Sequence, residues 1–455
     1  MNNIEIYNKL PIAIQNYICH IEGKRLNNER LKGKFLKFLY EYLERNDWSY
    51  QQLTKYKNEK LKKIIIHSYN TVPYYNQLFN ENKIKPNDIK TVNDLYIIPI
   101  LTKEIVRNIG DKLFSSVYKK KELIKGNTSG STGTSLEYYY TKEQIQEQFA
   151  LWWKYRICLG IKMDIWCADF GSKPIVPINQ NKPPYWRICE PLKQIKFSAF
   201  HGNPENYFYY YKEINKRKIK WIHGYPSSII PFAFYLEKEK LKFDHKIEFV
   251  TTGGENIYDF QRKQIFKAFG AYPYSHYGLG EGVANISEDI SHKLIVDEDF
   301  SVVEFIKNDL SHRIIGTSLS NFAMPLIRYD TGDLAVLPKN QLKNEKRQVL
   351  HIDGRSGELL RLKNGKTVGA LSALFTETSN IIEAQLHQRK DYSVEISYVS
   401  NSNEKEIDID IRKVTELFTA RIGDEIKLTF KRVDKIPRTS NGKLRYVITE
   451  FDTYI

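Results

Sequence analysis

A run of small residues constrains this chain more than any other segment. Residues 126–135 read GNTSGSTGTS, in which glycines alternate with serine, threonine and asparagine and no side chain is bulky. Glycines let backbone N–H groups turn toward an anion, and hydroxyl side chains add further donors. The flanking segments ELIKG and SLEYYYT have the composition of strands. We therefore predict a phosphate-binding loop between two strands, although such a stretch by itself is more often a surface turn.

The loop differs from the common nucleotide-binding loops in its surroundings. No GxxxxGK[ST] pattern can be placed on it, so it is not a Walker A loop. A helix is expected to begin at Thr141, because Thr-x-x-Gln suits a capping box and Ile145, Phe149, Trp152 and Trp153 form an apolar stripe. The assignment of the loop therefore depends on the motifs that follow it.

The composition is that of an ordinary globular protein. The 455 residues are 41% hydrophobic, which allows one large domain and a smaller one. The four cysteines form no CxxC pair, and no histidines are grouped at metal-ligand spacing, so we expect neither a disulfide framework nor zinc. The N-terminus lacks signal-peptide features, and no run reaches membrane-span length. We expect a cytoplasmic protein with no integral membrane segment.

The charge balance is basic. The chain has 69 Lys+Arg against 54 Asp+Glu, a formal net charge of +15. This excess could favour nucleotide phosphates or an anionic saccharide, and compositional drift could equally supply it. No module that reads RNA or DNA accompanies it, so we expect no nucleic-acid partner.

The chain changes character twice along its length. Residues 1–120 carry apolar residues at helical spacing and predict a helical N-terminal layer. Residues 121–355 alternate strand-like runs such as IEFVTTGG with helical stretches such as YDFQRKQIFKAFG, which is typical of an α/β fold. Residues 356–455 contain the runs SVEISYV and EIKLTFKRV around a helix and predict a small α+β lid domain. We expect the polar stretch 400–406 to be a hairpin tip.

Six further motifs follow the glycine-rich loop. In chain order they are HGYPSS at 223–228, TTGGENI at 251–257, YSHYGLGE at 274–281, IRYDTGDL at 327–334, GRSGELLRLKNGK at 354–366 and PRTSNGKLR at 437–445. Each motif is moderately specific, whereas all of them in this order are very specific. Together they resemble the core motifs of the adenylate-forming superfamily, which includes acyl-CoA synthetases, peptide-synthetase adenylation domains and luciferases.

Two additional segments narrow the resemblance. TVPYYNQLF at 71–79 and IPILTKEIVRN at 98–108 are similar to segments of the phenylacetate-CoA ligase branch, which includes relatives associated with capsular polysaccharide biosynthesis. The resemblance runs from Tyr74 to Arg445. It implies an α/β fold with a large N-terminal domain of mixed sheets and helices and a small α+β C-terminal lid. It also implies an ATP- and Mg²⁺-dependent ligase that activates a small-molecule carboxylate as acyl-AMP and passes the acyl group to a thiol or amine.

The resemblance implies a set of nucleotide-binding residues. Asp333 would accept hydrogen bonds from the ribose hydroxyls, which suits a carboxylate, while a turn aspartate beside a glycine is the structural alternative. Tyr277 would stack on adenine, with a core aromatic residue as the alternative, and Arg355 would add a ribose or phosphate contact, with a surface arginine as the alternative. Glu281 would hold Mg²⁺ beside the phosphates, with a solvated loop glutamate as the alternative. The remaining positions are Thr128, Ser129, Gly130, Ser131, Thr132, Gly133, Gly253, Gly254, Glu255 and Gly278.

Lys443 in PRTSNGKLR is the catalytic candidate that the resemblance implies. Acyl-AMP formation brings an anionic carboxylate against a triphosphate, and one ammonium group can offset their repulsion and the charge that develops on the α-phosphoryl oxygens. The lid must then move so that the acceptor can approach, and the resemblance places the pivot at Gly357. Glycine permits the necessary change in φ and ψ but supplies no side-chain contact.

Some positions depart from the pattern of the family. Gly280 stands where Thr or Ser usually precedes the glutamate, and the loop lacks a frequent Pro-Lys pair. ISEDISH contains His292 but no cysteine, so the zinc cluster of some relatives is not expected. Residues near the acyl pocket are expected to be Trp153, His201, His223, Tyr225 and His276, with a structural role as the alternative for each histidine.

Three functional hypotheses stay open from the sequence. The first is an acyl- or aryl-CoA ligase with CoA as the default acceptor. The second is an amide-forming ligase that joins an amine or amino acid to a carboxylate of a surface polysaccharide. The third is a non-catalytic nucleotide-binding scaffold, which Gly280 and Gly357 would suit. The sequence does not predict an oligomeric state.

Overall fold

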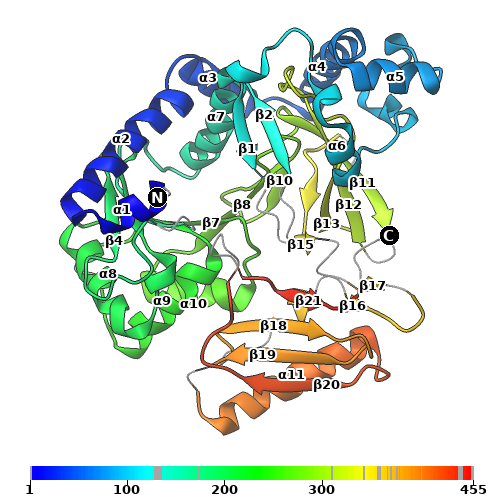
Figure 1. The fold of residues 1–455 in the computed structure, drawn as a ribbon. Coiled ribbons are helices and arrows are strands. Elements are labelled where there is room, and N and C mark those ends of the chain that lie inside the picture. The colour runs from blue at the N-terminus through cyan, green and yellow to red at the C-terminus, as the bar shows by residue number, and fades with distance from the viewer. Residues whose placement is uncertain are drawn as a thin grey trace. The chain divides into compact units, whose positions relative to one another are not determined.

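The chain divides into two compact units in the computed structural model (Figure 1). The first contains Met1–Arg25, Asp164–Ser275 and Asp353–Ile455, and the second contains Leu26–Met163 and His276–Ile352. The structure describes residues 3–127, 136–171, 175–308, 311–341, 344–355, 360–365, 367–368, 371–375, 378, 380–400, 402–438 and 444–451. The loop residues 128–133, the side chain of Arg355, the hinge candidate Gly357 and the catalytic candidate Lys443 lie outside this description.

The first unit is built on parallel strands in the order β7-β6-β3-β5-β4. Strands β3, β5, β6 and β7 are parallel and β4 runs antiparallel to β5. Their bounds are β3 Cys167–Phe170, β4 Trp186–Cys189, β5 Gln194–Phe197, β6 Trp221–Gly224 and β7 Phe249–Gly253. The predicted α/β organisation is therefore confirmed, with the run IEFVTTGG forming β7.

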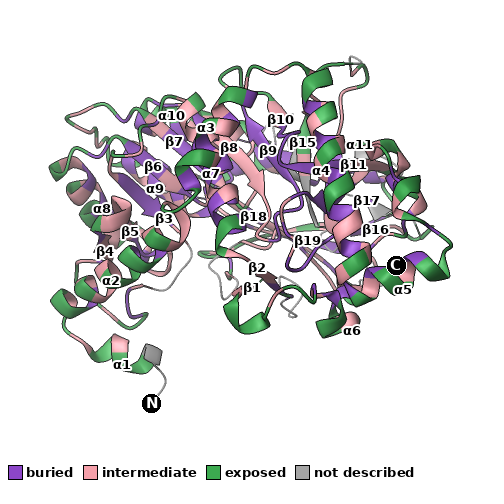
Figure 2. Ribbon diagram, turned by 90° about the horizontal axis from the view of Figure 1, so that it is seen from above, coloured by how far each residue is buried: buried purple, intermediate pink, exposed green. Residues whose placement is uncertain are grey.

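Helices cover this sheet and complete its core. They are α8 Pro204–Lys216, α9 Pro226–Lys238 and α10 Asp259–Phe269, and the segment YDFQRKQIFKAFG forms α10 as predicted. Ile222, Val250, Ile229 and Ile265 come from four of these elements and are fully buried together. Strands β3, β6 and β7 read as nearly continuous buried residues, which is the pattern of strands covered on both faces (Figure 2).

The C-terminal part of the first unit is a small α+β domain, as predicted. Its sheet has the order β20-β19-β18-β21, and α11 packs along it (Figure 1). The bounds are β18 Glu383–Gln388, β19 Val394–Val399, α11 Glu404–Ile422, β20 Leu428–Arg432 and β21 Val447–Thr449. Short elements precede it: β16 Leu360–Arg361, β17 Thr367–Val368 and the 3₁₀ helix Leu371–Phe375.

The prediction of a hairpin tip at 400–406 is wrong. This segment joins β19 to α11, and α11 then crosses over to β20, which pairs parallel with β19. Asn403 is the N-cap of α11, because its side chain accepts a hydrogen bond from the backbone N–H of Glu406 at 3.1 Å. We expected a turn here, but an Asn side chain can also accept a hydrogen bond from the unpaired backbone N–H groups at the start of a helix.

The second unit contains most of the helices in the N-terminal part of the chain. Its helices are α3 Phe35–Arg45, α4 Tyr50–Thr71, α5 Pro73–Glu81, α6 Lys103–Ile109 and α7 Lys142–Cys158, while α1 Asn3–Lys9 and α2 Ile12–Arg30 precede them. Thr141 caps α7 by accepting from the backbone N–H of Gln144 at 3.2 Å, as predicted. Among the described residues, no helix combines the length and apolar content needed to cross a membrane.

The strands of the second unit form three groups. The loop flanks form the two predicted strands, β1 Ile124–Asn127 and β2 Glu137–Tyr140, which pair antiparallel with Gly126 opposite Tyr138. A second group has the order β14-β10-β9-β8, and a third has the order β11-β12-β13-β15. The bounds are β8 Pro273–Gly278, β9 Asn285–Glu288, β10 Leu294–Val296, β11 Ser301–Asn308, β12 Ser311–Ser318, β13 Tyr329–Val336, β14 Gln348–Val349 and β15 His351–Arg355.

A buried charge group holds α4 to the segment that follows β10. Glu298 is 1% exposed and forms ion pairs with Lys57 and with Arg347, whose Nε donates to it at 2.6 Å. Burial alone would raise the pKa of Glu298, but Arg347 and Lys57 outweigh it and lower the pKa overall. The carboxylate therefore stays charged between two cations.

Glu298→Ala is expected to destabilise the protein by about 3–5 kcal/mol, because it leaves two buried cations without their counter-charge. Denaturant unfolding followed by circular dichroism measures this change. Glu59→Ala, an exposed position on the same α4 helix, is the matched control and should stay within about 0.5 kcal/mol of the wild type. Equal losses in the two variants would contradict a central role for the group.

Candidate functional site

The first unit brings two of the predicted motifs to one sheet edge. His223 lies on β6 and Gly253 ends β7, and the two strands are parallel neighbours. Their carboxyl ends therefore meet, where ligands usually sit in open α/β sheets. Gly254 follows with φ +74°, a conformation that favours glycine. At the end of β6, a Cβ on Gly224 would lie 2.5 Å from the carbonyl oxygen of Phe170 on β3, so only glycine allows this approach.

Glu255 ties these motifs together. Its carboxylate accepts hydrogen bonds from the backbone N–H of Ser227 at 3.0 Å, from the Ser227 hydroxyl at 2.9 Å and from the backbone N–H of Leu444 at 3.1 Å. Ser227 lies in the first turn of α9, where N–H groups lack partners within the helix and a negative charge is favourable. One carboxylate therefore joins TTGGENI to HGYPSS and to PRTSNGKLR.

Arg438 makes a second connection from the same C-terminal motif. Its Nη2 donates to the carbonyl oxygen of Ser227 at 3.1 Å, and its guanidinium forms an ion pair with Glu383 of β18. Burial raises the pKa of Glu383, and the Arg438 charge opposes that rise. Arg438 and Leu444 also pair in an antiparallel bridge. Both neighbours of 439–443 are thus held at this sheet edge, while Lys443 itself lies outside the described residues.

The second unit joins two of the motifs that were predicted to bind the nucleotide. The Tyr277 hydroxyl on β8 donates to Oδ2 of Asp333 on β13 at 2.8 Å. Burial, followed by the neighbouring Asp333 carboxylate, raises the pKa of Tyr277 far above its ordinary value, so the phenol keeps its proton. The backbone N–H of Asp333 is held by the Thr331 hydroxyl at 3.1 Å, and Gly332 has φ +77°. The turn places a buried carboxylate against an aromatic ring.

Glu281 lies in a tight turn just after β8 and is 8% exposed. The carbonyl oxygen of Leu279 accepts from the backbone N–H of Gly282 at 3.1 Å and from the Gln148 side chain of α7 at 2.6 Å, which fixes the turn. In the described part of the chain, no group of three or more His, Cys, Asp or Glu side chains could hold a metal ion. A single carboxylate still suits Mg²⁺, which takes one or two carboxylates together with phosphate oxygens and water.

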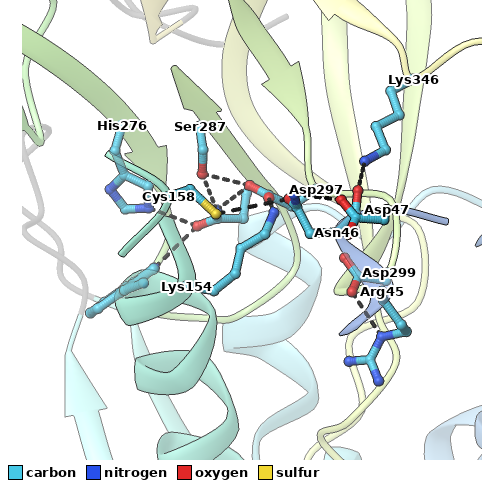
Figure 3. Close-up of polar contacts among 12 residues, drawn as sticks. Arg45, Asn46, Asp47, Lys154, Cys158, His276, Ser287, Asp297, Asp299 and Lys346 are labelled. Carbon is cyan, nitrogen blue, oxygen red and sulfur yellow. Dashed lines mark hydrogen bonds and ion pairs between the residues drawn. The ribbon is translucent and has the colours of Figure 1, made fainter. Parts of the chain in front are cut away.

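A buried polar network fixes the ring of His276 (Figure 3). Its Nε2 lies 2.8 Å from Oδ1 of Asn285, and the same Oδ1 accepts from the indole N–H of Trp152 at 3.1 Å. The Asn285 amide nitrogen donates to Asp297 at 2.6 Å, and a carboxylate can only accept. The Asn285 oxygen must therefore face His276, so Nε2 carries the proton and Nδ1 is an acceptor.

Further contacts hold this network in place. Asp297 also accepts from the Ser287 hydroxyl at 2.7 Å and forms an ion pair with Lys154 of α7 at 3.4 Å (Figure 3). Tyr155 stacks on the His276 ring with centroids 5.5 Å apart. Burial lowers the pKa of His276 to about 4, so the ring is neutral at physiological pH.

The remaining pocket candidates differ in how their polar atoms are used. Nε2 of His201 donates to the Gln180 carbonyl at 3.1 Å, so its Nδ1 accepts from the Ser198 hydroxyl at 2.8 Å, which favours the structural alternative for this residue. Nδ1 of His223 lies 2.9 Å from the Thr251 hydroxyl. Tyr225 is the N-cap residue of α9.

Trp153 was predicted to lie near the acyl pocket, whereas its neighbour Trp152 was expected only in the apolar stripe of the helix. Trp153 is 8% exposed and lies under the guanidinium of Arg156, whose centre is 5.1 Å from the ring. Trp152 is the residue of α7 that meets His276, with ring centroids 5.7 Å apart. Tyr155, which follows at i+3, and Asn285 were also missed. The spacing of Trp152 and Tyr155 on one helix face was the available signal.

Protonation of His276 should make stability depend on pH. Its pKa is about 4 in the folded protein and about 6.5 in an unfolded chain, so below pH 6.5 the unfolded state binds the proton first. This contribution to stability is present above pH 6.5 and is lost as the pH falls toward 4. His276→Gln is expected to flatten the fall in melting temperature across this window. Equal slopes in the wild type and in His276→Gln would contradict the assignment.

Known proteins resemble the chain along most of its length. It is 28% identical over 456 residues to Protein CapK of Staphylococcus aureus, covering 97% of this chain and 98% of that protein. It is 22% identical to phenylacetate-coenzyme A ligase of Thermus thermophilus, covering 83% of this chain and 84% of the relative. The match to CapK therefore extends over nearly the whole of both chains.

The fold and the C-terminal part also have named counterparts. The crystal structure of 2-hydroxyisobutyryl-CoA ligase in the postadenylation state matches with a TM-score of 0.65 at 16% identity, covering 87% of this chain and 89% of that chain. The family model described as CapK C-terminal domain matches residues 360–450. The two relatives, the structural neighbour and the family model together support the adenylate-forming superfamily, and within it a phenylacetate-CoA ligase-like branch, as the group that the chain resembles.

Proposed function

We propose that the chain is an ATP-dependent ligase that activates a carboxylic acid as acyl-AMP, releases pyrophosphate and transfers the acyl group to an acceptor. The hydrogen bond from Tyr277 to Asp333, at 2.8 Å, is the observation that carries this proposal. It joins the YGLGE and YDTGD motifs, which are 56 residues apart, into one aromatic and anionic surface. Such a surface suits a nucleoside, which offers a purine face and two ribose hydroxyls.

Each residue of the proposed nucleotide site has a distinct task. Asp333 would accept from the ribose hydroxyls, because a carboxylate has about four acceptor positions and Tyr277 occupies one. Tyr277 and Gly278 would contact the adenine, with Gly253 and Gly254 along its edge. Arg355 and the glycine-rich residues 128–133 would contact the phosphates. These roles follow the family resemblance and are supported by the geometry of Asp333 and Tyr277.

Charge neutralisation would drive the adenylation step. Glu281 would hold Mg²⁺, which when bound polarises phosphate oxygens and neutralises charge. Lys443 would place an ammonium group between the attacking carboxylate and the α-phosphate. The anchoring of Arg438 and Leu444 at the edge of β6 and β7 supports this role, because both flank the segment that carries Lys443.

The second step would require these same contacts to break. Glu255 and Ser227 bind the C-terminal motif through the Leu444 N–H and the Arg438 side chain, which are few and polar contacts. Such contacts can exchange with water at modest net cost. Rotation of the C-terminal domain about Gly357 would release them and open a path for the acceptor.

CoA is the default acceptor, and an amine is the second candidate. The phenylacetate-CoA ligase relative favours CoA. CapK, however, matches more of the chain at higher identity, and the family model at 360–450 is a CapK one. These observations keep open the joining of an amine or amino acid to a carboxylate, including one carried by an anionic saccharide.

Pyrophosphate release from Mg·ATP should depend on a carboxylic acid, and a panel of acids assayed with and without CoA or amines tests the proposal. Lys443→Ala should lose about 100-fold or more of this rate, because it removes the charge between the two anions. Lys431→Ala, an exposed lysine of β20, is the control and should match the wild type. Nucleotide binding without acid-dependent release across the whole panel would instead favour a scaffold role. Release of AMP that requires an amine would identify the amide-forming activity.

Asp333→Ala should raise the KM for ATP by about 10- to 100-fold, the loss expected for hydrogen bonds to a charged group. The preference for ATP over 2′-deoxy-ATP should shrink in the same variant, because the ribose hydroxyl loses its acceptor. Tyr277→Phe, which keeps the ring and removes only the hydroxyl, should retain that preference. A ribose preference that is unchanged in Asp333→Ala would refute the role of this carboxylate.

A further inference from the structure

Tyr138 fills the space that a side chain at position 280 would occupy. A Cβ on Gly280 would lie 2.0 Å from the Tyr138 hydroxyl oxygen and 2.9 Å from its Cζ. Both distances are shorter than any ordinary contact, so residue 280 must be glycine while Tyr138 keeps this position. The absence of Thr or Ser before Glu281 is thus matched by a tyrosine from another strand.

A second glycine allows Tyr138 to reach this point. Gly126 lies directly opposite Tyr138 in the β1–β2 pair. A Cβ on Gly126 would lie 2.3 Å from Cε2 of the tyrosine ring and 2.8 Å from its hydroxyl oxygen. The ring therefore crosses the bare backbone of Gly126 and extends to Gly280. Gly126 and Gly280 therefore both leave room for the side chain of Tyr138.

The surroundings of the Tyr138 hydroxyl indicate what it can bind. Tyr138 is 8% exposed, and no hydrogen bond joins its hydroxyl to any other residue that the structure describes. Phenylalanine would fill the same space, so the hydroxyl is not needed for the packing of the ring and can serve a ligand. A phenolic hydroxyl can donate a hydrogen bond, so it can bind an anionic oxygen.

We propose that Tyr138 binds the nucleotide, with its hydroxyl donating a hydrogen bond to a phosphate oxygen beside Glu281. The hydroxyl comes from β2, on one side of the turn that carries Glu281, instead of from residue 280 within that turn. The inference rests on the proposed function only in taking Mg·ATP or acyl-AMP as the ligand of Glu281. A neutral donor at this place binds an anion without competing with Glu281 for Mg²⁺.

The test uses the full chain and two measurements, Mg·ATP binding by calorimetry and acid-dependent pyrophosphate release. Tyr138→Phe keeps the ring and should keep the wild-type melting temperature. It should weaken Mg·ATP binding, and raise the KM for ATP, by about 10- to 100-fold, as expected for loss of one hydrogen bond to a charged group. Tyr139→Phe, the next residue on β2, whose hydroxyl donates to Glu137 at 3.3 Å, is the matched control and should behave as the wild type.

Substitution of Gly280 provides the reciprocal test. Gly280→Ser alone should bind Mg·ATP poorly, because its Cβ displaces the Tyr138 hydroxyl. The double variant Tyr138→Phe, Gly280→Ser removes that oxygen and returns a hydroxyl from position 280, so it should bind better than Gly280→Ser. Unchanged binding in Tyr138→Phe, or wild-type binding in Gly280→Ser, would overturn the proposal.

The two proposals fail in different ways. A wild-type chain that binds Mg·ATP but releases no pyrophosphate with any acid refutes the ligase activity, and the binding data then still decide the role of Tyr138. A wild-type chain that is active while Tyr138→Phe binds and reacts equally well refutes only Tyr138. A wild-type chain that binds no Mg·ATP refutes both.

Discussion

Parallel pairing of β3, β6 and β7 is the constraint on which the first unit depends. It brings the carboxyl ends of β6 and β7 to one edge, so that two motifs separated in the sequence end side by side. Glu255 and Ser227 can meet only because of this alignment. The start of α9 then faces a carboxylate, and the backbone of the C-terminal motif finds an acceptor on the same group.

Buried ion pairs connect segments of the second unit that lie far apart in the sequence. Glu298 binds Lys57 and Arg347, and Asp297 binds Lys154 while orienting Asn285. Asp297 and Glu298 lie between β10 and β11, while Tyr277 lies on β8 and Glu281 follows it. Buried pairs of this kind contribute little net stability compared with apolar residues, but they restrict the geometry because every partner must be satisfied. The polar network therefore fixes the ring of His276 on β8.

Local patterns predicted the fold well, and contacts between distant segments could not be predicted. Helical periodicity located the N-terminal helices, and alternation located β19 and β20, because these signals depend only on neighbouring residues. The motif order indicated Tyr277 and Asp333, but not their hydrogen bond. Trp153 was predicted near the pocket instead of Trp152 because adjacent residues on a helix point in different directions, and the sequence does not show which direction faces β8. Tyr138 carried no local signal, since its role depends on Gly126 across the ladder and Gly280 far along the chain. The segment 400–406 was misread because Asn favours both turns and helix N-caps.

The contact between Glu255 and Leu444 is made by a main-chain N–H, which has a consequence for sequence divergence. Every amino acid except proline carries that donor, so the side chain at position 444 can change among descendants while the contact survives. Glu255 has no such freedom, because its carboxylate also serves the first turn of α9. We therefore expect the residue at position 444 to vary among related sequences, and the glutamate at position 255 to vary much less.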